Sequence, residues 1–153
     1  MGTHYKGNKK ETTALNTYIK LMRASESINS SISSILVKKG LTYSQFNILE
    51  VLYHLGPLCQ REIGEKLLKS GGNITLVVDN LEKQGLVKRE KDESDRRYYK
   101  IILTKQGRSV IEKLFPKLVQ SIVEEFVVLN ENEQNEFQRM CKLIGIKDRK
   151  VTV

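Results

Sequence analysis

LLKSGGNITLVVDNLEKQGLVKREKDESDRRYYKIILT, residues 67–104, is the stretch that decides the fold. Apolar residues recur at helical spacing in its first half: Ile74, Val77, Val78 and Leu81. They predict a helix over about 72–84 that ends at Gly85. Residues 86–90 and 98–103, which are rich in β-branched, leucine and tyrosine residues, predict two strands joined by a polar loop. A helix followed by such a hairpin is the order of a winged helix-turn-helix, which favours DNA as the partner.

The segment before this stretch is predicted to hold three helices. Residues 12–40 carry leucine, isoleucine and methionine at three- and four-residue spacing, which is typical of one long amphipathic helix. A second helix begins at Thr42 or Ser44, since either side chain can cap it, and ends at the Gly-Pro pair 56–57. A short third helix then runs to Leu68.

Two further helices are predicted after the stretch. Thr104 caps a long helix whose axis Pro116 bends, and a last helix covers about 131–143. These helices and the first one carry long apolar faces, although they flank a small module. The faces pack against one another within the chain or against a second chain, and their length favours a dimer.

The expected fold is mainly α with a small β-hairpin wing. Its parts are a basic flexible arm (1–11), an N-terminal dimerisation helix (12–40), a winged helix-turn-helix DNA-binding domain (41–104) and C-terminal dimerisation helices (105–153). The net charge of +8 is unevenly placed. Residues 1–39 hold seven Lys and Arg against two Asp and Glu, and residues 59–105 hold 11 against eight. This excess favours a polyanionic partner.

Composition argues against several other classes of protein. Two cysteines make no disulfide framework, and no apolar run has the length of a membrane span, so the expected location is the cytoplasm. Two histidines and two scattered cysteines lack metal-ligand spacing, and neither a metal nor another cofactor is expected. His54 and Cys59 are close in sequence but lack an orienting third group and an oxyanion site, so no enzyme is expected.

Short motifs follow one another along residues 41–107. They are Leu41-Thr42-x2-Gln45-Phe46-x2-Leu49, Gly56-Pro57-Leu58, Ile63-x3-Leu67, Asn73-Ile74-Thr75-x2-Val78-Asp79-x-Leu81-Glu82-Lys83-x-Gly85-Leu86-Val87, Asp95-Arg96-Arg97 and Leu103-Thr104-x2-Gly107. In this order they resemble the MarR family of bacterial winged-helix transcription regulators. The resemblance implies a homodimer that binds an inverted-repeat operator in double-stranded DNA and acts as a repressor released by a small effector.

Two positions depart from the family pattern. Leu76 stands where the family often has a basic residue, and the pair Gly71-Gly72 stands where it usually has one residue with a side chain. Base contacts are therefore expected from Asn73, Thr75 and backbone amides. The run from Gly71 to Thr75 also resembles a subset of the family that senses phenolic or quinone-like compounds.

The start of the helix over 72–84 has the chemistry needed to read bases in the major groove. Paired glycines let the backbone approach phosphate at a helix N-terminus, and Asn73 can donate and accept together, as adenine requires. The predicted contacts in this region are Lys69, Ser70, Gly71, Gly72, Asn73, Thr75 and Leu76. The alternative is that residues 70–73 form a helix cap and nothing more.

The polar loop of the hairpin carries the other predicted contacts. In the family pattern Asp-x-Arg, Asp95 holds the loop and Arg97 enters the minor groove, while Arg96 touches phosphate or braces the loop. The alternative is a solvated cluster of charges. Further phosphate contacts are predicted for Lys88, Lys91 and Lys100, each of which is otherwise a plain surface lysine.

An effector site and a redox site are weighed against simpler roles. The residues considered for effector binding are Met22, Arg23, Phe46 and Tyr53, for which core packing is the alternative. Cys59 precedes the third helix in the place of a capping residue, with Glu62 three positions later and Arg61 nearby. The helix dipole and Arg61 favour a thiolate, which makes Cys59 a candidate thiol-based sensor. A winged-helix module that binds a protein instead of DNA is the remaining alternative.

Overall fold

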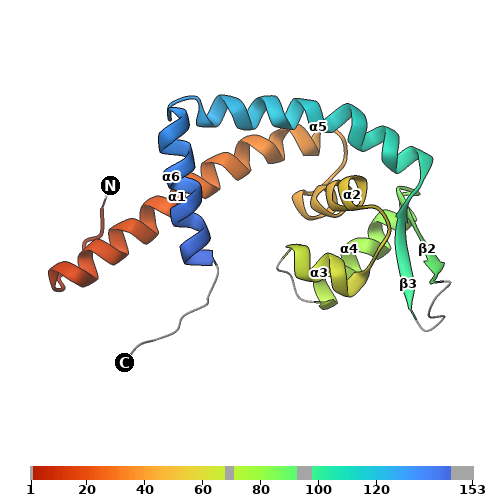
Figure 1. Cartoon of the computed structure of the whole chain (residues 1–153), viewed down its shortest axis with the longest axis horizontal. Coiled ribbons are helices and arrows are strands. Elements are labelled where there is room, and N and C mark those ends of the chain that lie inside the picture. The colour runs from red at the N-terminus through yellow and green to blue at the C-terminus, as the bar shows by residue number, and fades with distance from the viewer. Residues whose placement is uncertain (1, 68–70, 93–97, 146–153) are drawn as a thin grey trace.

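The computed structural model describes residues 2–67, 71–92 and 98–145. In chain order its elements are α1 (Lys9–Val37), α2 (Tyr43–Leu55), β1 (Leu58–Cys59), α3 (Gln60–Leu67), α4 (Gly71–Lys83), β2 (Val87–Lys91), β3 (Tyr99–Leu103), α5 (Lys105–Phe126) and α6 (Glu131–Gly145). The helices α2, α3 and α4 and the sheet form one lobe, from which α1 and α5 extend side by side (Figure 1). The predicted class, mainly helical with a small β wing, is confirmed.

Capping side chains fix where two of the helices begin. The Thr42 hydroxyl accepts from the Gln45 backbone N–H at 3.2 Å, and the Gln45 amide oxygen accepts from the Thr42 N–H at 2.9 Å. This reciprocal pair makes Thr42, and not Ser44, the cap of α2. Thr104 caps α5 as predicted, since its hydroxyl accepts from the Gly107 N–H at 3.0 Å.

Two ends of elements differ slightly from the expected ranges. Asn8 caps α1 together with Glu11, so the helix begins at Lys9, inside the segment 1–11 that was expected to be an arm. Gly85 has a φ of 70°, the left-handed conformation predicted for the residue that ends the helix over 72–84. That helix, α4, itself covers Gly71–Lys83.

The small sheet has the strand order β1-β3-β2, and both pairings are antiparallel. The two predicted strands pair from Val87 opposite Leu103 to Lys91 opposite Tyr99. The strand β1 was not predicted, because a two-residue strand has no periodicity for a sequence pattern to reveal. It places Cys59 in the sheet opposite Lys100, directly before the first turn of α3.

The core lies inside the lobe and under the adjoining parts of α1 and α5. The side chains with the least exposure are Leu36, Ile48, Leu49, Leu52, Ile63, Val78, Leu81, Val87, Ile101, Ile111 and Leu118. They come from α1, from the three helices of the lobe, from the wing strands and from α5 as far as Leu118. The two long helices are thereby fixed to the lobe at one end only.

The far ends of the long helices and α6 are packed very differently. No residue of α6 is buried. Large apolar side chains that remain exposed on these segments are Tyr18, Met22, Val119, Ile122, Val123, Val127, Val128, Met140, Leu143 and Ile144. No helix in the described part of the chain has the length and apolarity to cross a bilayer.

Candidate nucleic-acid interface

One face of α4 is anchored in the lobe, and the opposite face is exposed. Ile74, Val78 and Leu81 are at most 3% exposed and hold the helix to the core. Asn73 and Thr75 are exposed, and Leu76 has 62% of its surface exposed. The structure therefore leaves on the surface the side chains that the sequence predicted to read bases.

Gly72 is also exposed at the start of α4. A Cβ built on it would meet no atom within 4 Å, and its φ is not in the left-handed range. Nothing within the described residues therefore requires glycine at this position. The start of α4 therefore has open space beside its backbone at Gly72.

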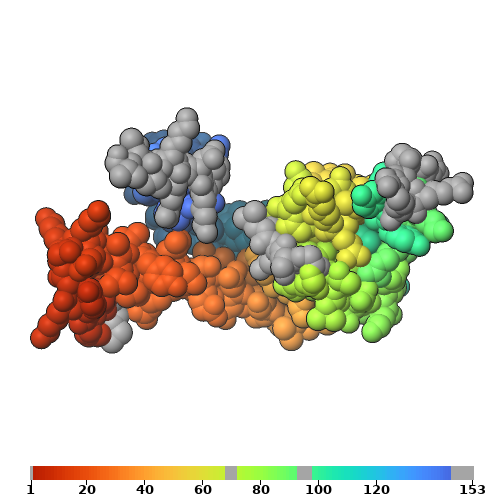
Figure 2. Space-filling model, turned by 90° about the horizontal axis from the view of Figure 1, so that it is seen from below, coloured from red at the N-terminus to blue at the C-terminus, as the bar shows by residue number. Residues whose placement is uncertain are grey.

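The helices α3 and α4 and the wing strands lie together on the face seen from below (Figure 2). An ionic cluster between α4 and β2 holds this face together. The Arg89 guanidinium of β2 contacts the Asp79 carboxylate at 2.5 Å and also pairs with Glu82, whose other oxygen accepts from the Arg89 backbone N–H at 3.0 Å. Desolvation lowers the pKa of Arg89, but the hydrogen bonds to Asp79 and Glu82 raise it by more. The guanidinium is therefore a fixed cation that ties the wing to α4.

The same arginine reaches α3 through Gln60. The Gln60 amide oxygen accepts from Arg89 Nη2 at 3.3 Å and from Nε at 3.4 Å. The Gln60 amide nitrogen donates to the Thr75 hydroxyl at 2.8 Å. The sequence alone does not reveal the roles of Gln60 and Arg89, since only the fold brings together residues 15 and 29 positions apart. The available signal was the pair Asp79 and Glu82, spaced for one helix face and followed by an arginine after the turn.

The lysines predicted to touch phosphate have different surroundings. Lys88 pairs with Glu90, and Lys100 pairs with Asp92 at 3.1 Å, while Lys91 is exposed. The remaining predicted residues Lys69, Ser70, Asp95, Arg96 and Arg97 lie outside the described residues. The hairpin is closed on its described side by the Asp92 N–H, which donates to the Tyr98 carbonyl at 3.0 Å.

Comparison with known proteins decides the family. A model of the MarR family matches residues 41–99. The transcriptional regulator MhqR of Bacillus subtilis is 36% identical over 133 residues, which cover 87% of this chain and 92% of MhqR. The chain belongs to the MarR family. It is therefore a DNA-binding transcriptional regulator of the winged helix-turn-helix type and not an enzyme.

Solved structures of MarR-family regulators share the fold. Sco3205 of Streptomyces coelicolor, solved in complex with DNA, is 20% identical, with a TM-score of 0.82 over 94% of this chain and 91% of that one. CouR of Rhodococcus jostii, solved with p-coumaroyl-CoA, is 24% identical, with a TM-score of 0.78 over 86% of this chain and 93% of that one. MarR homologues thus bind DNA and small molecules, and dimerisation is typical of the family.

Cys59 sits at the junction of β1 and α3 in this MarR-family chain. Its backbone N–H donates to the Glu62 carboxylate at 2.7 Å, which is the predicted second half of a capping box. That hydrogen bond is the main cause that lowers the pKa of Glu62. The Arg61 guanidinium pairs with Glu65 at 2.9 Å. The charge that was expected to favour a Cys59 thiolate thus has a carboxylate partner, and redox sensing by Cys59 stays a prediction.

The residues considered for effector binding are spread over two helices. Phe46 is 8% exposed and belongs to the core, whereas Met22 is 48% exposed on α1 and Arg23 is exposed beside it. Tyr53 lies edge-on to the His54 ring, with ring centroids 5.1 Å apart, and beneath the Arg108 guanidinium. Their role in effector binding stays a prediction. Among the described residues, no three His, Cys, Asp or Glu side chains are grouped as metal ligands would be.

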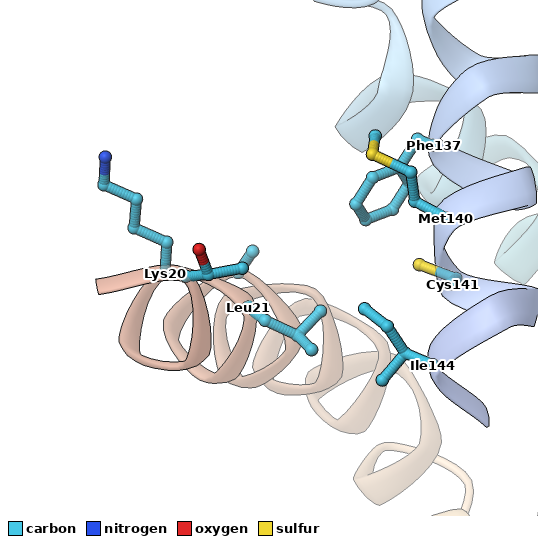
Figure 3. A pocket seen from close by; sticks show the side chains of 8 residues that line it. Lys20, Leu21, Phe137, Met140, Cys141 and Ile144 are labelled. Atoms are coloured by element: carbon cyan, nitrogen blue, oxygen red, sulfur yellow. The ribbon is translucent and has the colours of Figure 1, made fainter. Parts of the chain in front are cut away.

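The hollows at the terminal helices are lined by other residues. A cavity of about 370 Å³ separates α1 from α6 (Figure 3). Its lining consists of Thr17, Lys20, Leu21, Ala24, Phe137, Met140, Cys141 and Ile144. Leu21 and Ile144 point toward one another across the cavity, and Lys20 points away from α6. The two helices are therefore separated by an apolar space that their own side chains do not fill.

Proposed function

We propose that this MarR-family regulator acts in the cytoplasm as a homodimeric repressor that binds an inverted repeat and is released by a small phenolic or quinone-like effector. The observation that carries the proposal is the exposed face of α4, which presents Asn73, Thr75 and Leu76 on a helix packed against the wing strand β2. An amide, a hydroxyl and an apolar group on one turn of a helix suit the edges of bases in a major groove. Sco3205, which shares the fold, was solved in complex with DNA, and this supports DNA as the partner.

Each exposed side chain has a matching base edge. The Asn73 amide can donate and accept toward adenine, and the Leu76 methyl groups suit the methyl group of thymine. Gly72 leaves room for a phosphate at the positive end of α4. Arg97 of the wing loop enters the minor groove beside these bases, while Asp95 holds the loop and Arg96 meets phosphate. Lys69 and Lys91 add phosphate contacts that position the protein without specifying sequence.

A second copy of the chain is the proposed partner of the terminal helices. Exposed apolar side chains are gathered on the second half of α5 and on α6, where no residue of α6 is buried. A stable fold rarely leaves so large an apolar surface in water. A two-fold dimer through these helices places two α4 helices on successive major grooves and therefore selects an inverted repeat.

The effector class is proposed on two observations. The run Gly71 to Thr75 resembles the subset of the family that senses phenolic or quinone-like compounds, and CouR holds a ligand with a p-coumaroyl group. Such a ligand releases DNA if it binds more tightly to a form of the dimer whose α4 helices do not fit the operator.

Selection of bound duplexes from a random-sequence library tests the proposal. The intact chain is compared with Arg97→Ala at physiological salt, and Lys113→Ala on the first half of α5 controls for the loss of an exposed cation. We expect an inverted repeat from the intact chain and from Lys113→Ala, with weaker binding and lost selectivity at the flanks for Arg97→Ala. Recovery of no enriched sequence by the intact chain would overturn the proposal and favour a protein partner.

A further inference from the structure

We propose that Gln60 is a positioning residue of the DNA interface, which sets the side-chain rotamer of Thr75 and so determines the base preference at the position that Thr75 contacts. The inference rests on the proposed function, because it assumes that Thr75 faces a base. Gln60 is the first residue of α3 and lies outside α4. Its effect on recognition is therefore exerted through the hydroxyl to which it donates.

The orientation of the Gln60 amide is dictated by its neighbours. An arginine has only donors, so the group that faces Arg89 must be the amide oxygen. That oxygen receives Nη2 at 3.3 Å and Nε at 3.4 Å. The amide nitrogen is consequently directed at Thr75, whose hydroxyl oxygen lies 2.8 Å away. The amide thus has one orientation that satisfies both partners.

Arg89 is itself held in place. Its guanidinium is bound by Asp79 and Glu82, three residues apart on α4, and the side chain is 22% exposed. Two carboxylates on one rigid helix fix the planar guanidinium in position and orientation. Gln60 therefore receives its hydrogen bonds from an anchored group. Its own amide is held in one orientation as a result, and it donates from that orientation to Thr75.

The selected rotamer of Thr75 matters because threonine in a helix divides between two χ1 rotamers. In one rotamer the methyl group takes the place that the hydroxyl group holds in the other. One presents a polar group and the other an apolar group to the same base edge, and these favour different bases. A hydrogen bond of 2.8 Å from a fixed amide selects the rotamer that keeps the hydroxyl oxygen toward α3. Base preference at this position should therefore depend on Gln60 as well as on Thr75.

Gln60→Met tests this inference, because methionine keeps the length and removes both amide groups. We would determine base preferences for the intact chain, Gln60→Met, Thr75→Val and the double variant by selection from a random duplex library. The salt dependence of binding and thermal unfolding would be measured on the same proteins. Gln106→Met, at an exposed glutamine in the first turn of α5, is the matched control.

The expected result is an approximately 5-fold loss of preference at one base pair of each half-site in Gln60→Met, at the same pair as in Thr75→Val and without further loss in the double variant. The salt slope should not change, because no phosphate contact is removed. A change in Thr75→Val alone would overturn the positioning role and leave the proposed function intact. Equal weakening at every base pair in Gln60→Met would likewise overturn it, as would unchanged preferences in both variants. No motif from the intact chain would instead defeat the proposed function, and the inference with it.

Discussion

The DNA-binding lobe and the terminal helices of one chain are stabilised in opposite ways. In the lobe, helices and strands cover one another, and side chains such as Ile48, Leu49 and Ile63 are fully buried. Among the terminal helices, by contrast, α6 buries no residue and faces α1 over an apolar cavity of about 370 Å³. The lobe supplies its own core, whereas the terminal helices lack partners for their apolar faces. Folding of the lobe and assembly of the dimer should therefore respond to different substitutions.

Val123→Glu should produce the largest effect on the terminal helices. Val123 is 56% exposed on the second half of α5, and a two-fold interface there would bury the new carboxylate in both copies. We expect a monomer in sedimentation equilibrium at micromolar concentration. Affinity for the full inverted repeat should fall by about 100-fold or more, because the second half-site no longer binds in the same molecule.

The matched control for this substitution is Val37→Glu. Val37 is 71% exposed at the end of α1, next to the lobe and away from the cavity that borders α6. This variant should remain dimeric and bind DNA as the intact chain does. If Val123→Glu stayed dimeric while keeping its operator affinity, the apolar surface of α5 would not be the interface.

Gly72→Ala tests whether the glycine at the start of α4 serves DNA binding and not the stability of the lobe. The added Cβ meets no atom within 4 Å, and alanine is a better helix former than glycine by about 0.5–1 kcal/mol. The free energy of unfolding should therefore increase slightly in urea denaturation. Operator affinity should decrease by about 10-fold, since the methyl group would occupy the space that the proposed docking gives to a phosphate at the start of α4.

Opposite changes in stability and binding would separate a functional glycine from a structural one. If Gly72→Ala bound the operator as tightly as the intact chain, the start of α4 would be a helix end with no close approach to DNA. Gly145→Ala at the end of α6, where a Cβ also has open space, controls for a general effect of removing glycine.

Local patterns predicted most of the elements that position the interface. The apolar spacing of Ile74, Val78 and Leu81 identified α4 and its buried face. Thr104 was predicted as the cap of α5, and Thr42 was one of two residues predicted to cap α2. Each of these signals lies within a few residues of the feature that it specifies. Sequence periodicity is therefore sufficient to predict them.

Features that depend on distant residues escaped prediction. The pairing of β1 with β3 places Leu58 opposite Ile101, and a two-residue strand is too short for its sequence to predict this pairing. The link from Arg89 through Gln60 to Thr75 joins three elements that only the folded lobe brings together. Whether such a polar contact forms depends on differences of a few tenths of an ångström between donor and acceptor. The spacing of residues along the sequence does not determine these distances.

Glu62→Gln should produce the smallest effect, and its dependence on pH identifies its cause. The hydrogen bond from the Cys59 N–H lowers the pKa of Glu62 below the ordinary value of 4.5, so the ionised carboxylate stabilises the folded lobe above that value. This contribution is lost as the pH falls through the lowered pKa, where Glu62 becomes protonated in the folded state too. Urea denaturation should therefore show Glu62→Gln to be less stable than the intact chain by about 0.5 kcal/mol at pH 7, after allowance for solvent screening. At a pH below the lowered pKa of Glu62 the two proteins should be equally stable. Glu26→Gln on α1 is the control. A loss of stability in Glu62→Gln that persists unchanged at low pH would show that the amide does not fit the cap. The charge of Glu62 would then have no part in the effect.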